Sequence, residues 1–396
     1  MPPRDPAWDA LRGVAILCVV AAHSVGPYVS RPLPGLLWPV YEPARPLMAG
    51  TEGLPGPAIT DFVFWTIRTF TVPLFFFIAG AFGAKSLAHT DPRVFARTRL
   101  ARLLPALLLG LAWMVVVMYP IWAWGWVKFG YAAPGHILHA HFGPAVQRNL
   151  HGFGHLWYLW YLILLTCALA WSWPLLRRAV EHPRVPALAL RAPVAIGALL
   201  ILLTPVAAFL PDAVFVFDNS YIPTPGFFLF HAVFFVWGAV ASRPLLDAQS
   251  PARRTLGNIA PILLITGAII AVVLTRLITP AMHVMQNQDP PLVPGLQDRL
   301  RVGTCAAFGA GAFILGLVGL FTLWQRPPAW LSALGRISLW VYITHLAWVG
   351  LAAVLLFRVQ IPSEAKAACA FAFSLAVTLT TRALLTRTRI GKWMGA

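Results

Sequence analysis

Residues 11–29 read LRGVAILCVVAAHSVGPYV, a mainly apolar run that contains one arginine and one histidine. A helix of this length crosses roughly 30 Å of hydrocarbon, because each residue adds about 1.5 Å. Similar runs recur along the whole chain of 396 residues, of which 59% are apolar and 11% are charged. An ordinary soluble domain carries about a quarter charged residues. The composition therefore excludes a water-soluble fold and predicts an all-α, polytopic membrane protein.

The apolar runs predict a bundle of ten membrane-spanning helices within one domain, residues 1–396. We expect the spans at residues 10–29, 59–84, 100–124, 155–175, 193–210, 224–241, 258–279, 302–324, 337–357 and 364–384. Three longer connections, residues 30–58, 125–154 and 280–301, fall on the same side of the predicted bundle. They either build a pocket on that side or are solvated connectors.

The net charge of +17 raises the question of nucleic-acid binding. The basic residues lie in short clusters between apolar runs, which is typical of topology signals, so we expect no nucleic-acid partner. If the N-terminus is cytoplasmic, 20 of the 30 basic residues lie on the cytoplasmic side, eight lie outside, and two fall within spans. This bias predicts that both termini are cytoplasmic.

Asp9, Arg12 and His23 form the sharpest polar pattern in the first predicted span. A charged group at the centre of a span costs about 2.5–3.5 kcal/mol, so each such residue needs a reason. Arg12 and His23 are eleven positions apart, which is about three turns plus 20° and about 16 Å along a helix, so they share one face. A neutral imidazole near mid-membrane suits a general base. The alternative is a histidine satisfied by a neighbouring helix.

Arg99 and Arg102 are one turn apart at the start of the third predicted span. Two guanidinium groups on one helix face suit phosphate binding. Anchoring by the positive-inside rule is the alternative.

His345 lies deep in the ninth predicted span, and it has the same two interpretations as His23. His155 and Trp157 begin the fourth span, where they are either site residues or part of an aromatic interfacial belt.

A group of histidines on the outer side of the third and fourth spans invites a metal-site interpretation. Its members are His136, His139, His141, His151 and His155. No cysteine or carboxylate accompanies them in a recognised spacing, so we expect no metal. The sequence also lacks a P-loop, a G-x-S-x-G elbow and an H-E-x-x-H motif, which argues against ATP-driven transport and against serine or zinc hydrolysis.

Four segments, in order along the chain, resemble the membrane acyltransferase-3 family, whose members O-acylate glycans and lipids across bacterial membranes. They are Trp8–His23 with ten residues between Arg12 and His23, Val72–Phe82 with its phenylalanines and Gly80, Arg99–Pro105 with Arg99 and Arg102, and Ile337–His345 with Ser338 and Tyr342. Four ordered matches over nearly the whole chain are much more specific than any one alone.

The resemblance implies a ten-helix core in a bacterial plasma or inner membrane. It also implies that His23 is the catalytic base and that Arg99 and Arg102 contact an acyl-CoA donor. We add Arg12 and Asp9 to His23 as candidate catalytic residues. Four further residues are candidates for substrate binding: His155, Trp157, Tyr342 and His345.

The expected reaction moves an acyl group from acyl-CoA to a hydroxyl of an extracytoplasmic saccharide or glycolipid. Acetyl-CoA is the favoured co-substrate. Succinyl-CoA is the alternative, because the segment after Gly154 resembles the glucan-succinylating branch and lacks the glutamate that many glycan O-acetyltransferases have there. A proton-coupled transporter or flippase of a lipid-linked glycan is the competing hypothesis, with intramembrane histidines as the proton relay. Neither the acceptor nor the oligomeric state follows from the sequence.

Overall fold

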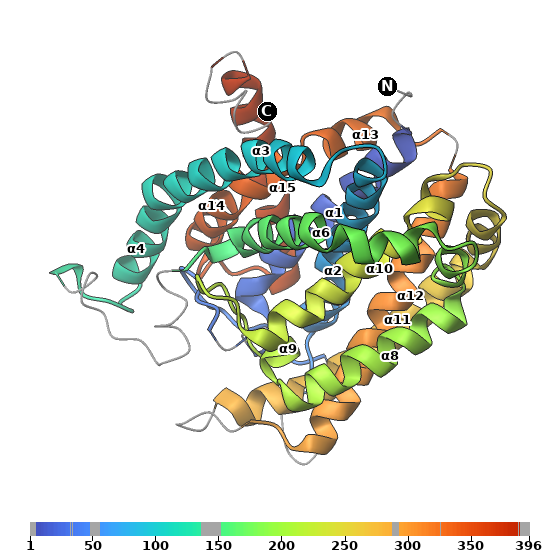
Figure 1. Ribbon diagram of the computed structural model, residues 1–396. Helices are drawn as coiled ribbons and strands as arrows, with labels where there is room; N and C mark the ends of the chain where they lie inside the picture. Colours follow the sequence, from blue (N-terminus) through green and yellow to red (C-terminus); the bar gives the residue numbers. More distant parts are fainter. Residues whose placement is uncertain are drawn as a thin grey trace.

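The computed structural model describes residues 5–31, 33, 35–47, 56–135, 152–286, 293–324, 326–386 and 388. Within these residues the secondary structure is helical, without a strand, which confirms the predicted fold class (Figure 1). The long helices are α1 (Pro6–Val25), α2 (Ile59–Leu87), α3 (Pro92–Trp113), α4 (Tyr119–Lys128), α6 (Trp157–Glu181), α8 (Ala192–Phe209), α10 (Pro225–Leu246), α11 (Pro251–Gln286), α12 (Leu296–Leu323), α14 (Ser338–Leu356) and α15 (Ser363–Leu385). The short ones are η1 (Gly26–Tyr28), η2 (Met114–Met118), η4 (Gly154–Leu156), α7 (Val185–Leu188), α9 (Asp212–Phe215) and α13 (Ala329–Arg336).

Ten helical segments in the described part of the chain are long and apolar enough to cross a membrane, and each overlaps a predicted span. Two begin well before the predicted boundary, α3 at Pro92 and α11 at Pro251. Apolar patterning marks only the part of a helix that lies in hydrocarbon. Helix α3 instead begins where Asp91 caps it, since that carboxylate accepts hydrogen bonds from the backbone N–H groups of Arg93 (2.8 Å) and Val94 (3.3 Å).

The third span consists of α3 and α4 joined by one turn of π-helix, Met114–Met118. Pro120 is the second residue of α4, and a proline lacks the N–H that would bond to the preceding turn of helix. The wider π-helical turn accommodates this missing bond and marks the junction between the two helices.

Helices α1 and α2 lie at the centre of the bundle (Figure 1). Helix α1 contacts α2, α12, α13, α14 and α15, while α2 contacts α1, α6, α10, α11 and α12. The α1 side chains of Leu11, Ile16 and Val20 are accordingly at most 1% exposed. A polar residue in the middle turns of either helix therefore faces protein or an internal space.

Glycines allow α2 and α10 to pack backbone against backbone. A Cβ atom at Gly80 would overlap the carbonyl oxygen of Phe235, and a Cβ atom at Gly238 would overlap the carbonyl oxygen of Phe77. The two contacts are reciprocal, so neither helix can accept a side chain at its crossing point. This explains why the phenylalanine-rich segment of α2 contains a glycine at this position.

Helix α13 packs against the start of α1 in the same manner. A Cβ atom at Gly335 would overlap the carbonyl oxygen of Asp9, and one at Gly13 would overlap the carbonyl oxygen of Leu331. The hydroxyl of Ser332 also donates to the carbonyl oxygen of Pro6 at 3.0 Å. These contacts fix the position of the first turns of α1, which carry Asp9 and Arg12.

Candidate active site

A continuous cavity of about 870 Å³ extends through the helix bundle between two ends of different chemistry. We call one the basic end, formed by Arg12, Lys85, Arg99, Arg102, Arg253 and Arg336. We call the other the aromatic end, formed by Trp38, Tyr119, Trp122 and Trp126. Eight of the nine predicted site residues line this cavity: Asp9, Arg12, His23, Arg99, Arg102, His155, Trp157 and Tyr342.

The basic end keeps a large positive charge after its ion pairs are taken into account. Asp9 lies 3.5 Å from Arg12, and Asp5 lies 3.2 Å from Arg253. The remaining four cations of the basic end form no ion pair with an acidic residue in the described part of the chain. An end with several uncompensated cations attracts a polyanionic ligand.

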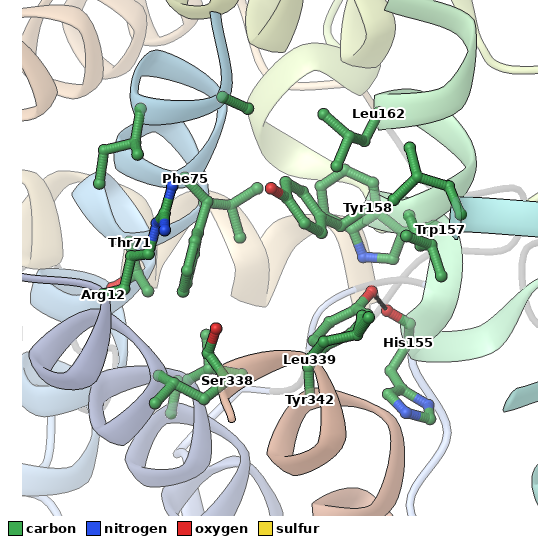
Figure 2. A pocket seen from close by; sticks show the side chains of 18 of the residues that line it. Arg12, Thr71, Phe75, His155, Trp157, Tyr158, Leu162, Ser338, Leu339 and Tyr342 are labelled. Carbon is green, nitrogen blue, oxygen red and sulfur yellow. Dashed lines mark hydrogen bonds between the residues drawn. The ribbon is translucent and has the colours of Figure 1, made fainter. Parts of the chain in front are cut away.

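Aromatic residues hold Arg12 in place. Phe82 of the phenylalanine-rich segment contacts Arg12, and Trp8 of the Arg12 motif packs against Phe82. The Arg12 guanidinium lies 4.9 Å from the ring centroid of Phe82, and that ring packs edge-on against Trp8 at 5.7 Å. Figure 2 shows Arg12 and Phe75 on one side of the cavity, with Tyr158 on the other. Arg12 therefore faces the cavity from a fixed position.

His23 forms a hydrogen-bonded pair with His345. The Nδ1 atom of His23 lies 2.7 Å from Nε2 of His345, and the two rings are stacked with centroids 4.9 Å apart. His345 Nδ1 lies 2.8 Å and 2.9 Å from the carbonyl oxygens of Val341 and Tyr342. Because a carbonyl oxygen can only accept, Nδ1 of His345 carries the proton.

The hydrogen bonds of this pair fix both tautomers. A neutral His345 with its proton on Nδ1 has a lone pair on Nε2, so His23 must donate from Nδ1. The Nε2 atom of a neutral His23 then carries a lone pair. His23 lines the cavity, whereas His345 is fully buried behind it and does not. Neutral His23 thus has the free lone pair that a base requires, and His345 lies where it can hold His23 in place.

His155 and Tyr342 connect η4 to α14 beside this pair. The hydroxyl of Tyr342 donates to the carbonyl oxygen of His155, as Figure 2 shows. Nε2 of His155 donates to the carbonyl oxygen of Ile343 at 3.1 Å, which leaves Nδ1 of His155 buried and without a hydrogen-bond partner among the described residues. Both side chains line the cavity, as does Trp157.

The aromatic end is closed partly by residues 35–38, which lie in the loop that follows α1. The indole N–H groups of Trp122 and Trp126 donate to the carbonyl oxygens of Leu37 and Trp38, both at 3.0 Å. The Trp38 ring lies 6.3 Å from the His23 ring and stacks on Trp122 at 6.5 Å. Since the indole N–H groups of Trp122 and Trp126 are occupied, these two tryptophans offer mainly their ring faces.

Trp38 and Arg68 are among the cavity residues to which no role was assigned from the sequence. Trp38 lies in a loop, where spacing carries no information about its neighbours. Arg68 falls within a predicted span. The free-energy cost of a charge there indicates a functional residue, but Arg68 belongs to none of the recognised motifs. Both line the cavity.

The predicted histidine cluster lies largely outside the described residues, which include His155 but not His136, His139, His141 or His151. Within the described part, no three histidine, cysteine or acidic side chains come together in a way that suits a metal ion.

The ten spans and the long internal cavity define a multi-pass membrane protein whose polar groups face an interior space. Comparison with known families gives its class. The sequence model of the acyltransferase-3 family, described as an acyltransferase domain, matches residues 5–387. The chain therefore belongs to this family and is a membrane acyltransferase. No curated protein and no solved structure matches it.

Proposed function

We propose that the protein transfers an acyl group from acyl-CoA to a hydroxyl of an extracytoplasmic saccharide or glycolipid, with His23 as the general base. The observation that carries this proposal is the arrangement of the cavity. One continuous space joins the basic end to a histidine whose acceptor nitrogen is set by its hydrogen bonds, and then to the aromatic end.

The basic end suits the donor. CoA carries a pyrophosphate and a 3′-phosphate, and guanidinium groups bind phosphates through charge-assisted hydrogen bonds. Arg99 and Arg102 would hold these phosphates, with the CoA arm extending into the cavity toward His23. The excess of basic residues on the same side of the bundle supports a cytoplasmic position for this end, where acyl-CoA is made.

The aromatic end suits a saccharide acceptor. Sugar rings present apolar C–H faces that pack on aromatic rings, and Trp38, Trp122 and Trp126 offer such rings. An acceptor bound there would place a hydroxyl group beside His23, since Trp38 contacts both Trp122 and His23.

The chemistry then follows from the histidine pair. Nε2 of His23 takes the proton of the acceptor hydroxyl as its oxygen attacks the thioester carbonyl. The C–S bond breaks, the acyl group stays on the acceptor oxygen as an ester, and the proton passes from His23 to the departing CoA thiolate. His345 would act as a positioning residue: as His23 becomes an imidazolium, the Nδ1 hydrogen bond to His345 strengthens and stabilises it.

The function is tested by supplying purified, reconstituted protein with radiolabelled acetyl-CoA or succinyl-CoA and with saccharide and glycolipid fractions of bacterial envelopes. We expect label to move into one fraction while free thiol is released in equal amount. Movement of an unchanged glycolipid across the bilayer, driven by a proton gradient and without thiol release, would instead establish the transporter. Paired intramembrane histidines are the observation that keeps this second function open.

The donor site makes a separate prediction. Changing Arg99 and Arg102 together to alanine is expected to raise KM for acyl-CoA about 10- to 100-fold, because a hydrogen bond to a charged group contributes about 1.5–3 kcal/mol. The matched control changes Arg93 and Arg97, which lie on the same helix but do not line the cavity. An acyl-pantetheine donor without phosphates should be insensitive to both double variants. Equal effects of the two double variants on KM would argue against a donor site at Arg99 and Arg102.

A further inference from the structure

Arg68 is a cation inside the membrane-spanning part of the protein, and none of the residues that the structure describes supplies an anion for it. It lies in α2 within a candidate span and lines the cavity. In the described part of the chain it forms no hydrogen bond or ion pair, and its one contact of note is with the Trp65 ring, 5.8 Å away. The side chain is partly buried, and its exposed part faces the cavity.

Arg68 lies at a similar depth to His23. The backbone N–H of Ser30, just after α1, donates to the Asp61 carboxylate near the start of α2 at 2.9 Å, which sets the two segments side by side. His23 is seven residues before Ser30, and Arg68 is seven residues after Asp61. Each is thus roughly 10–15 Å from that bond along its own segment. Arg68 is also within electrostatic range of His23.

An unpaired guanidinium at this depth is costly, and a cation–π contact offsets only part of the cost. The acidic side chains that line the cavity in the described part are Asp5 and Asp9, and both belong to ion pairs at the basic end. No acidic side chain of the described residues is thus left for Arg68, and a bound substrate can supply the anion.

We propose that Arg68 binds a carboxylate at the free end of the acyl group, so that the preferred donor is the CoA thioester of a short dicarboxylic acid rather than acetyl-CoA. This inference rests on the proposed function. A donor entering from the basic end leads with its acyl group, which extends past the thioester held at His23. The acceptor approaches from the aromatic end, to which Arg68 does not belong. A guanidinium can bind a carboxylate through two parallel hydrogen bonds.

The test compares succinyl-CoA with butyryl-CoA, whose acyl chain has the same number of carbons but no carboxylate. Binding of each to purified protein is measured by calorimetry. For the wild type we expect succinyl-CoA to bind about 10- to 100-fold more tightly, the range that a hydrogen-bonded charge supplies. Arg68→Gln should remove this preference and leave the affinity for butyryl-CoA unchanged.

Two further variants complete the design. Arg68→Lys keeps the charge without the planar fork, so it should retain part of the preference. Arg276→Gln removes an exposed arginine from another span, away from the cavity, and should retain all of it.

The outcomes separate the inference from the function on which it rests. Equal binding of the two thioesters by the wild type would overturn the inference alone. If Arg68→Gln weakened the binding of succinyl-CoA and butyryl-CoA equally, the inference would also be overturned. Arg68 would then act on a part of the donor that the two thioesters share. If neither thioester binds, the proposed function fails and the inference falls with it.

Discussion

Replacing His23 by alanine is expected to lower the rate of acyl transfer about 10²- to 10⁴-fold, the usual contribution of a general base. The variant keeps the basic end, so its KM for acyl-CoA should change little while kcat falls. Thiol release and ester formation by purified, reconstituted protein measure both quantities. His89→Ala is the control, because His89 is exposed in the turn between α2 and α3.

Variants of His345 show whether the pair, and not one residue, sets the rate. His345→Ala leaves the Nδ1–H of His23 without its acceptor, so we expect kcat to fall about tenfold or more. A glutamine at position 345 offers an amide oxygen in its place and should restore part of the activity. Full acyl transfer by His23→Ala would rule out His23 as the general base. Equal activity of His345→Ala and His345→Gln would rule out a positioning role for His345.

Gly238→Ala is expected to destabilise the folded protein by about 3 kcal/mol or more, because one added carbon forces α10 away from the backbone of α2. The matched control is Gly197→Ala in α8, where a Cβ atom would meet no other atom within 4 Å. Alanine is favoured over glycine in a helix by about 1 kcal/mol, so this control should be neutral or stabilising.

The measurement is the fraction of monodisperse protein that remains in detergent after heating to a series of temperatures. A lower midpoint for Gly238→Ala and an unchanged or higher one for Gly197→Ala is the expected pattern. If both variants shift alike, the crossing of α2 and α10 does not depend on backbone contact.

Hydropathy predicted the ten spans because each must be apolar over the thickness of a bilayer. It could not predict where α3 and α11 begin, since no apolar pattern reaches those ends, and at α3 the Asp91 cap determines the first residue. Helix α13 was also missed. It is only eight residues long, and its packing depends on Gly335 meeting the backbone of Asp9.

Helical spacing placed Arg12 and His23 on one face of the first span, and both do line the cavity. Spacing cannot name a partner from a distant helix, however. His23 and His345 are 322 positions apart in the chain, and His345 was expected to bind substrate. Its position behind His23 favours a supporting role instead, although the roles of all these residues stay predictions.

The charge on Arg68 also has a consequence for the membrane itself. A long internal cavity is a potential leak, and a leak of protons would dissipate the gradient that a cell maintains. A fixed positive charge within a narrow passage repels protons and other cations, as do the cations of the basic end. The groups suited to an anionic donor thus also disfavour cation passage, so a route for a large substrate need not become a conductive pore.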